Sequence, residues 1–223
     1  MLQSVKSWAK DHGLALVNGA LFVAFFIGMV LTGANSYSSD QVEHGEQPVT
    51  ILQYLATGDF MEATFENWES EFLQMGSYVA MTAFLFQRGS SESKPLDGAE
   101  QDEDPREAEI EPSTPWPVRR GGIWLRLYEH SLLILFAVLF LASLVLHGAG
   151  GAAAYDAEQQ EHGLPGVGFP GYLWTSQFWF ESFQNWQSEF MVITVMLIAS
   201  VYLRQRGSSQ SKPVAASNAR TGD

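Results

Sequence analysis

The chain has 223 residues and a net charge of −13, and its 12 Lys and Arg residues are too few to supply the basic surface that nucleic acid requires. It contains no cysteine, which excludes disulfides, thiolate metal sites and a cysteine nucleophile.

Four apolar stretches follow one another along the chain, and each predicts a membrane-spanning helix. The first, residues 14–34, is long enough to cross a hydrocarbon core of about 30 Å. The later three, residues 71–86, 131–146 and 190–203, are shorter, and aromatic segments extend the second and fourth toward the outer membrane surface. The sequence therefore predicts an all-α membrane protein with four transmembrane helices, arranged as two parallel-repeat helical hairpins with interfacial outer loops.

The distribution of positive charge predicts the orientation. Every Lys and Arg lies in a terminal tail, in the middle connection or at an adjoining span end, whereas residues 35–70 and 150–188 contain none. Because segments that carry Lys and Arg stay in the cytoplasm, both termini are predicted to be cytoplasmic and the two loops without Lys or Arg to lie outside. The first stretch has features of a signal peptide, but the same unit recurs at the third stretch, which predicts a retained helix.

The chain also contains an internal repeat. Residues 7–95 align with residues 125–213 without a gap, and about 32 of 89 positions are identical. Each repeat contains two spans, so both repeats are predicted to share one orientation around a pseudo-twofold axis along the membrane normal. The predicted parts are a first two-span repeat (1–95), an acidic disordered cytoplasmic linker (96–123), a second two-span repeat (124–213) and a polar tail (214–223).

Several sequence motifs, three of which occur in both repeats, resemble those of a known family. These motifs are Glu-His-Gly, Asn-Trp-x-Ser-Glu-Phe and Arg-Gly-Ser-Ser-x-Ser-Lys-Pro, each present twice, and a single Pro-Trp-Pro-Val-Arg-Arg-Gly-Gly at residues 115–122. Together they resemble a family of small duplicated four-span bacterial membrane proteins known only as a domain of unknown function. The resemblance implies the bacterial inner membrane as the location and the lipid bilayer as a partner, and it implies no particular activity.

Polar residues recur at the outer ends of the second and fourth stretches. Three positions in each repeat share one helix face by their spacing. If both faces point at the pseudo-twofold axis, two carboxylates and two amides converge, which suits a hard cation or a shared proton. The alternative is a row of hydrated groups at the level of the lipid headgroups. The residues of this predicted outer polar site are Asn67, Ser70, Glu71, Asn185, Ser188 and Glu189.

Histidines form a second group of candidates. His44 and His162 lie at equivalent positions in the outer loops, and a histidine beside acidic residues can bind a metal or respond to pH. No paired histidine spacing supports a metal, and the alternative is a turn at Gly45 and Gly163 on which each histidine packs. His147 has no counterpart in the repeat and is expected at the membrane interface.

Basic residues follow the inner ends of the second and fourth stretches. Arg88 and Arg206 suit the last turn of a helix, and the glycine after each suits a left-handed closing residue. The recurrence of the following Ser and Lys residues supports a second interpretation, in which Arg88, Lys94, Arg206 and Lys212 contact a lipid phosphate.

The outer loops are expected to hold short amphipathic helices on the outer leaflet. Their residues expected to face lipid are Tyr54, Leu55, Phe60, Tyr172, Leu173 and Phe178.

The chain lacks the motifs of nucleophilic hydrolases, phosphate-binding loops and zinc proteases, so no cofactor is expected and an enzyme is the least favoured class. The sequence favours a non-enzymatic multi-pass inner-membrane protein whose duplicated acidic outer face binds a cation, a proton or a protein partner. The alternative is a small channel or transporter that uses the pseudo-twofold axis. A homodimer is compatible with both, and the sequence specifies no small-molecule ligand.

Overall fold

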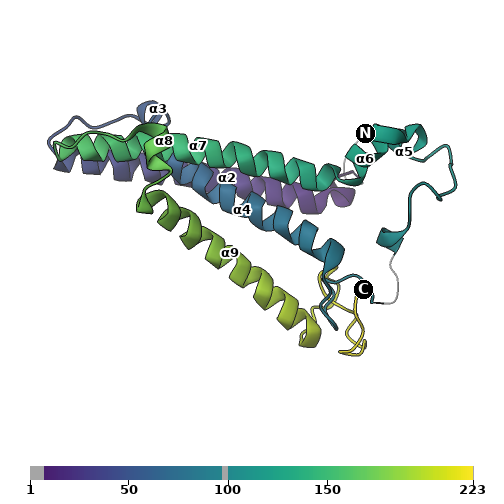
Figure 1. Ribbon diagram of the computed structural model, residues 1–223. Helices are drawn as coiled ribbons and strands as arrows, with labels where there is room; N and C mark the ends of the chain where they lie inside the picture. Colours follow the sequence, from purple (N-terminus) through teal and green to yellow (C-terminus); the bar gives the residue numbers. More distant parts are fainter. Residues whose placement is uncertain (1–7, 97–99, 223) are drawn as a thin grey trace. The chain divides into compact units, whose positions relative to one another are not determined.

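The computed structural model describes residues 8–96 and 100–222, and within these ranges the chain contains helices and no strands (Figure 1). The predicted helical character is confirmed. The elements are α2 (Gly13–Glu43), α3 (Ile51–Tyr54), α4 (Gly58–Phe84), η1 (Glu100–Asp102), α5 (Trp116–Arg120), α6 (Gly122–Glu129), α7 (Ser131–Glu161), α8 (Gly168–Tyr172) and α9 (Ser176–Tyr202).

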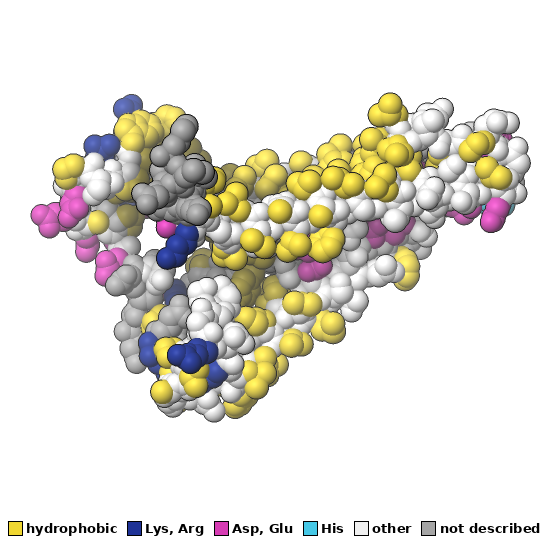
Figure 2. Space-filling view, turned by 180° about the vertical axis from the view of Figure 1, so that it is seen from behind, with side chains coloured by type: hydrophobic (Ala, Val, Ile, Leu, Met, Phe, Trp, Pro, Cys, Tyr) yellow, Lys and Arg dark blue, Asp and Glu magenta, His cyan; other side chains and the backbone are white. Residues whose placement is uncertain are grey.

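Helices α2 and α7 are long and apolar enough to cross a membrane, by length and composition. Each has 31 residues, which at 1.5 Å per residue is about 46 Å and exceeds a hydrocarbon core of about 30 Å. Large apolar side chains stay exposed along both, such as Phe25 at 72% and Val138 at 58%, and Figure 2 shows hydrophobic side chains along the long helices. The second and fourth predicted stretches lie in α4 and α9, and their membrane crossing stays a prediction.

The helix bounds follow the spacing of the sequence repeat. The bounds of α7 and α9 each lie 118 residues after those of α2 and α4, which is the offset that aligns the two repeats. Equivalent sequence positions therefore begin and end equivalent helices.

The chain divides into two compact units. Unit 1 contains Met1–Thr64 and Gly148–Tyr172, and unit 2 contains Phe65–His147 and Leu173–Asp223. Both α4 and α7 contribute residues to each unit.

Two tyrosines pack against glycines in unit 1. Tyr54, at the end of α3, is 5% exposed and its ring covers Gly33 of α2, while Tyr172, at the end of α8, is fully buried over Gly151 of α7. A Cβ on Gly151 would lie 2.5 Å from the Tyr172 hydroxyl oxygen, so only glycine leaves room for the ring. The expectation that these tyrosines face lipid is therefore wrong, because each glycine opens a space that the ring fills.

Other contacts in unit 1 tie the loop segments to the helices. The Tyr172 hydroxyl donates to Glu62 Oε1 at 3.1 Å. Asp156 of α7 accepts from the backbone N–H groups of Val167 and Gly168 at 2.6 Å and 3.0 Å, which joins the start of α8 to α7. Of the remaining residues expected to face lipid, Leu55, Phe60 and Leu173 are half-buried and Phe178 is buried.

The C-terminal ends of α4 and α9 are joined by polar contacts in unit 2. The hydroxyl oxygens of Ser90 and Ser200 lie 2.6 Å apart, and both residues are buried. The C-terminal segment closes over them, because Gly222 N–H donates to the Ser90 carbonyl at 2.9 Å and Gly89 N–H donates to Thr221 Oγ1 at 2.9 Å. The tail predicted only as polar is thus packed on the first Arg-Gly-Ser-Ser segment.

Candidate functional site

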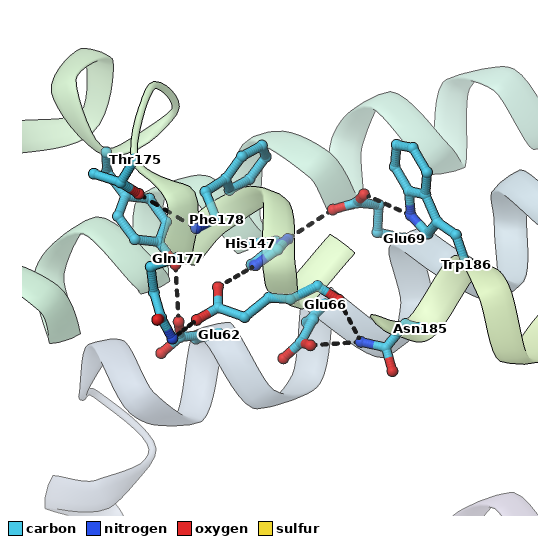
Figure 3. A network of polar contacts seen from close by, with 11 residues as sticks. Glu62, Glu66, Glu69, His147, Thr175, Gln177, Phe178, Asn185 and Trp186 are labelled. Carbon is cyan, nitrogen blue, oxygen red and sulfur yellow. Dashed lines mark hydrogen bonds and ion pairs between the residues drawn. The ribbon is translucent and has the colours of Figure 1, made fainter. Parts of the chain in front are cut away.

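Three helices bring one histidine and three glutamates together in unit 2. His147 lies on α7, Glu66 and Glu69 lie on α4, and Glu181 lies on α9. His147 and Glu69 are fully buried, whereas Glu66 and Glu181 are half-buried. These four residues form the His147 cluster, and Figure 3 labels His147, Glu66 and Glu69.

The imidazole of His147 contacts a different carboxylate through each ring nitrogen. Nδ1 lies 2.7 Å from Glu69 Oε2, and Nε2 lies 3.4 Å from Glu181 Oε2. A protonated imidazole donates from both nitrogens, whereas a neutral one donates from only one. The number of carboxylates that His147 can satisfy therefore depends on its own protonation.

Uncharged hydrogen-bond donors on α9 bind the two carboxylates that α4 contributes to the cluster. The indole N–H of Trp186 donates to Glu69 Oε1 at 3.1 Å, so both oxygens of this buried side chain have partners. The side-chain amide of Asn185 donates to Glu66 Oε1 at 2.5 Å. Figure 3 shows Trp186 and Asn185 reaching the glutamates of α4. The Asn-Trp pair of the repeated motif in the second repeat therefore binds the acids of the first repeat.

Two residues one turn before Glu181 on α9 also contact the cluster. The Gln177 amide donates to Glu181 Oε1. The Phe178 ring stacks on the imidazole of His147 with 5.1 Å between ring centroids. Phe178 is 3% exposed and Gln177 is exposed, so an apolar ring shields His147 while a polar amide borders Glu181.

The charges of the cluster do not balance. The cluster contains three carboxylates and one imidazole, so with every group ionised its net charge is −2. Residues 35–70 and 150–188 contain no Lys or Arg that could offset the excess. Because burying unpaired charge is costly, this arrangement favours the uptake of protons or of a cation.

One residue of the predicted outer polar site, Asn185, contacts the His147 cluster, because its side-chain amide binds Glu66. The hydroxyls of Ser70 and Ser188 each donate at 2.8 Å to a carbonyl three residues earlier in their own helices. Of the remaining residues of this predicted site, Asn67 and Glu71 are exposed and Glu189 is half-buried. A cation bound between the two repeats at this site stays a prediction.

The outer-loop histidines lie at helix ends. Nδ1 of His44 lies 2.9 Å from the Asp40 carbonyl oxygen and Nδ1 of His162 lies 2.9 Å from the Glu158 carbonyl oxygen. The glycine after each histidine has a positive φ, 85° and 71°, as in a helix-closing turn. The hydrogen bond to the Asp40 carbonyl, and then the Asp40 charge, raises the pKa of His44.

The lysines of the predicted lipid-phosphate site bind the chain itself. Lys94 caps the end of α4 and pairs with Asp102 at 2.5 Å. Arg88 and Arg206 are exposed, so a lipid phosphate at these two residues stays a prediction. Lys212 is only 1% exposed. Its ammonium group donates to main-chain carbonyls of Gly89, Val201, Ser217, Asn218 and Arg220.

His147 is expected at the membrane interface, and that depth stays a prediction; its side chain is fully buried and contacts two carboxylates. Sequence reasoning from duplicated motifs does not find the charged cluster, since none of its members is duplicated. This break in the repeat is the signal that identifies them. Glu66, Glu69, Glu181 and His147 stand at positions equivalent to Gln184, Gln187, Ala63 and Met29.

Comparisons with curated proteins and with solved structures gave no match. One protein family matches residues 5–223, nearly the whole chain, and no function is assigned to it. This match confirms the resemblance carried by the duplicated motifs. The chain belongs to the family described as Domain of unknown function (DUF6766).

Proposed function

We propose that the chain is a multi-pass inner-membrane protein, without enzymatic activity, that binds protons at the His147 cluster near the outer membrane surface. The charge imbalance carries this proposal, because one buried imidazole contacts the carboxylates of Glu69 and Glu181, and a third carboxylate, that of Glu66, lies one turn before Glu69 on α4. The two long apolar helices support a membrane location. The confinement of Lys and Arg to the other connections supports cytoplasmic termini.

Aromatic residues on α9 support the proposed depth of the cluster. Trp179, Phe180 and Phe183 are 42%, 64% and 55% exposed, and aromatic rings gather at membrane–water boundaries. They lie between Phe178 and Trp186 on α9, which contact the cluster. A cluster at this level is within reach of protons from outside the cell, yet shielded enough that an unpaired charge is unfavourable.

Proton uptake by the purified protein in nanodiscs tests the proposal. The pH is lowered from about 7.5 to about 5.5 in weak buffer, and bound protons are counted with a pH indicator. We expect the wild type to bind at least about one proton more than Glu69→Gln/Glu181→Gln, because the variant lacks two of the three acids. Equal uptake by both proteins contradicts the proposal.

A matched control removes two carboxylates of α4 and α9 outside the cluster, in the variant Glu71→Gln/Glu189→Gln. We expect this variant to take up protons as the wild type does. If it loses the uptake instead, proton binding belongs to the predicted outer polar site. The alternative, a channel or transporter, predicts ion flux across the membranes of vesicles. This flux can be measured with the same variants.

The cysteine-free chain makes the topology directly testable. Single cysteines at Ser39 and Ser209, both exposed, mark the proposed outer end of α2 and the proposed cytoplasmic C-terminal segment. In intact cells, a membrane-impermeant maleimide is expected to label Ser39→Cys and not Ser209→Cys. The reverse labelling pattern, or labelling of both, contradicts the proposed orientation.

A further inference from the structure

The two carboxylates that flank His147 differ in their access to solvent. The side chains of His147 and Glu69 are 0% and 1% exposed, whereas that of Glu181 is 13% exposed. We propose that protons reach and leave the cluster through Glu181, pass across His147 and are held at Glu69. This inference rests on the proposed proton binding, and it adds a path and a direction.

The contacts of each group fit its part in this path. Glu181 Oε1 accepts from the amide of the exposed Gln177, and Glu181 Oε2 faces Nε2 of the imidazole. Glu69 lies on the opposite ring nitrogen, where the Trp186 indole fixes its other oxygen. His147 therefore contacts both carboxylates, one through each ring nitrogen.

Transfer across the ring conserves every proton. It begins with protonated Glu181, a neutral imidazole that carries its proton on Nδ1, and ionised Glu69. The O–H bond of Glu181 breaks as a bond forms to Nε2, and the Nδ1–H bond breaks as a bond forms to a Glu69 oxygen. The imidazole ends as the other neutral tautomer, and one proton has moved from Glu181 to Glu69. The reverse steps release it.

The other charged groups that face the ring in unit 2 favour storage at Glu69. Glu66 lies one turn before Glu69 on α4 and is held by the Asn185 amide, and no Lys or Arg lies in residues 35–70 or 173–188. With a second carboxylate nearby and no Lys or Arg in these segments, a proton on Glu69 removes the charge that is most completely buried.

Trp186 provides a reporter for the test, because its indole N–H binds Glu69 directly. Stopped-flow mixing lowers the pH of the full-length protein in nanodiscs from about 7.5 to about 5.5 while tryptophan fluorescence is recorded. The component lost in Trp186→Phe reports the state of Glu69. We expect Glu69→Gln to abolish this component.

Glu181→Gln distinguishes the path from the store. We expect it to slow the Trp186 response by about 100-fold while its final amplitude is kept, and Glu181→Asp to restore the rate. Glu189→Gln, an acid of the same helix outside the cluster, is expected to leave the rate unchanged.

An unchanged rate in Glu181→Gln overturns the proposed path, and so does the loss of the final amplitude in a variant whose helical circular dichroism is intact. Failure of the proposed function gives a different result, since the wild type then shows neither proton uptake nor a pH-dependent Trp186 signal.

Discussion

Replacing His147 with methionine, the residue at the equivalent position of the first repeat, removes the only base of the cluster. Glu69 Oε2 is then buried without the imidazole that binds it, and a buried carboxylate that has lost its partner is more stable protonated than charged. A glutamate in water is half-protonated at about pH 4.3, so protonating it costs about 3.7 kcal/mol at pH 7 and about 1 kcal/mol at pH 5, at 1.36 kcal/mol per pH unit. We expect His147→Met to lose about 3–4 kcal/mol of unfolding free energy at pH 7 and about 1 kcal/mol at pH 5.

Denaturant unfolding in detergent micelles, followed by helical circular dichroism at both pH values, measures these losses. The double variant His147→Met/Glu69→Gln carries at both positions the residues of the other repeat, and it buries no charge at either. We expect it to lie within about 1 kcal/mol of the wild type. A loss in His147→Met that does not depend on pH, or a double variant as unstable as the sum of the single variants, refutes this reasoning.

Gly151→Ala places a Cβ 2.5 Å from the Tyr172 hydroxyl oxygen, and we expect it to destabilise the protein by about 1–3 kcal/mol; thermal unfolding unchanged from the wild type contradicts this packing. Lys212→Met leaves main-chain carbonyls of the C-terminal segment without their shared donor, so amide hydrogen exchange there is expected to rise at least about ten-fold, and unchanged exchange rejects the role of this lysine. The pKa of His44 is expected above its ordinary value of 6.5 because the Asp40 carbonyl and charge favour the protonated ring, and Asp40→Asn is expected to lower it in an NMR titration. Because folding raises this pKa, the contribution of His44 to stability is present below pH 6.5 and is lost as the pH rises through the folded value; a pKa at or below 6.5 is the contradicting result.

The long apolar runs predict where the main helices lie, because few other structures accommodate so many apolar residues in sequence. They do not predict how far the helices continue. α7 runs on to Glu161, well past the predicted end at 146, through a segment that contains Gly150 and Gly151. Glycine in a sequence indicates the end of a helix, because it costs about 1 kcal/mol inside one. Here it allows close packing, since a Cβ on Gly150 would lie 2.6 Å from the Glu62 backbone nitrogen.

The outer-loop tyrosines illustrate the same limit. Apolar and aromatic residues in a loop beside a membrane favour lipid contact when only the loop is considered. Whether Tyr54 faces lipid or its own chain depends on Gly33, a residue of another helix. Local pattern therefore predicts that a ring is removed from water, and only the tertiary structure decides what covers it.

The charged site is hard to predict for a related reason. Periodicity assigns Glu69 and Glu181 to helices, but it does not state that these helices turn the two residues toward His147. The duplicated motif contains Asn185 and Trp186, which bind the acids, and it does not contain the acids themselves. The neutral framework is present in both repeats, and the ionisable groups are not.

This division has a consequence for how the cluster is assembled. Two identical hairpins that associate place every side chain twice. A pair of first repeats contains Glu66 and Glu69 with no histidine at the position of His147, and a pair of second repeats contains His147 and Glu181 with glutamine at both other positions. Neither homodimer assembles the complete set, so the cluster requires two different halves. A chain that carries both repeats supplies them in a fixed one-to-one ratio.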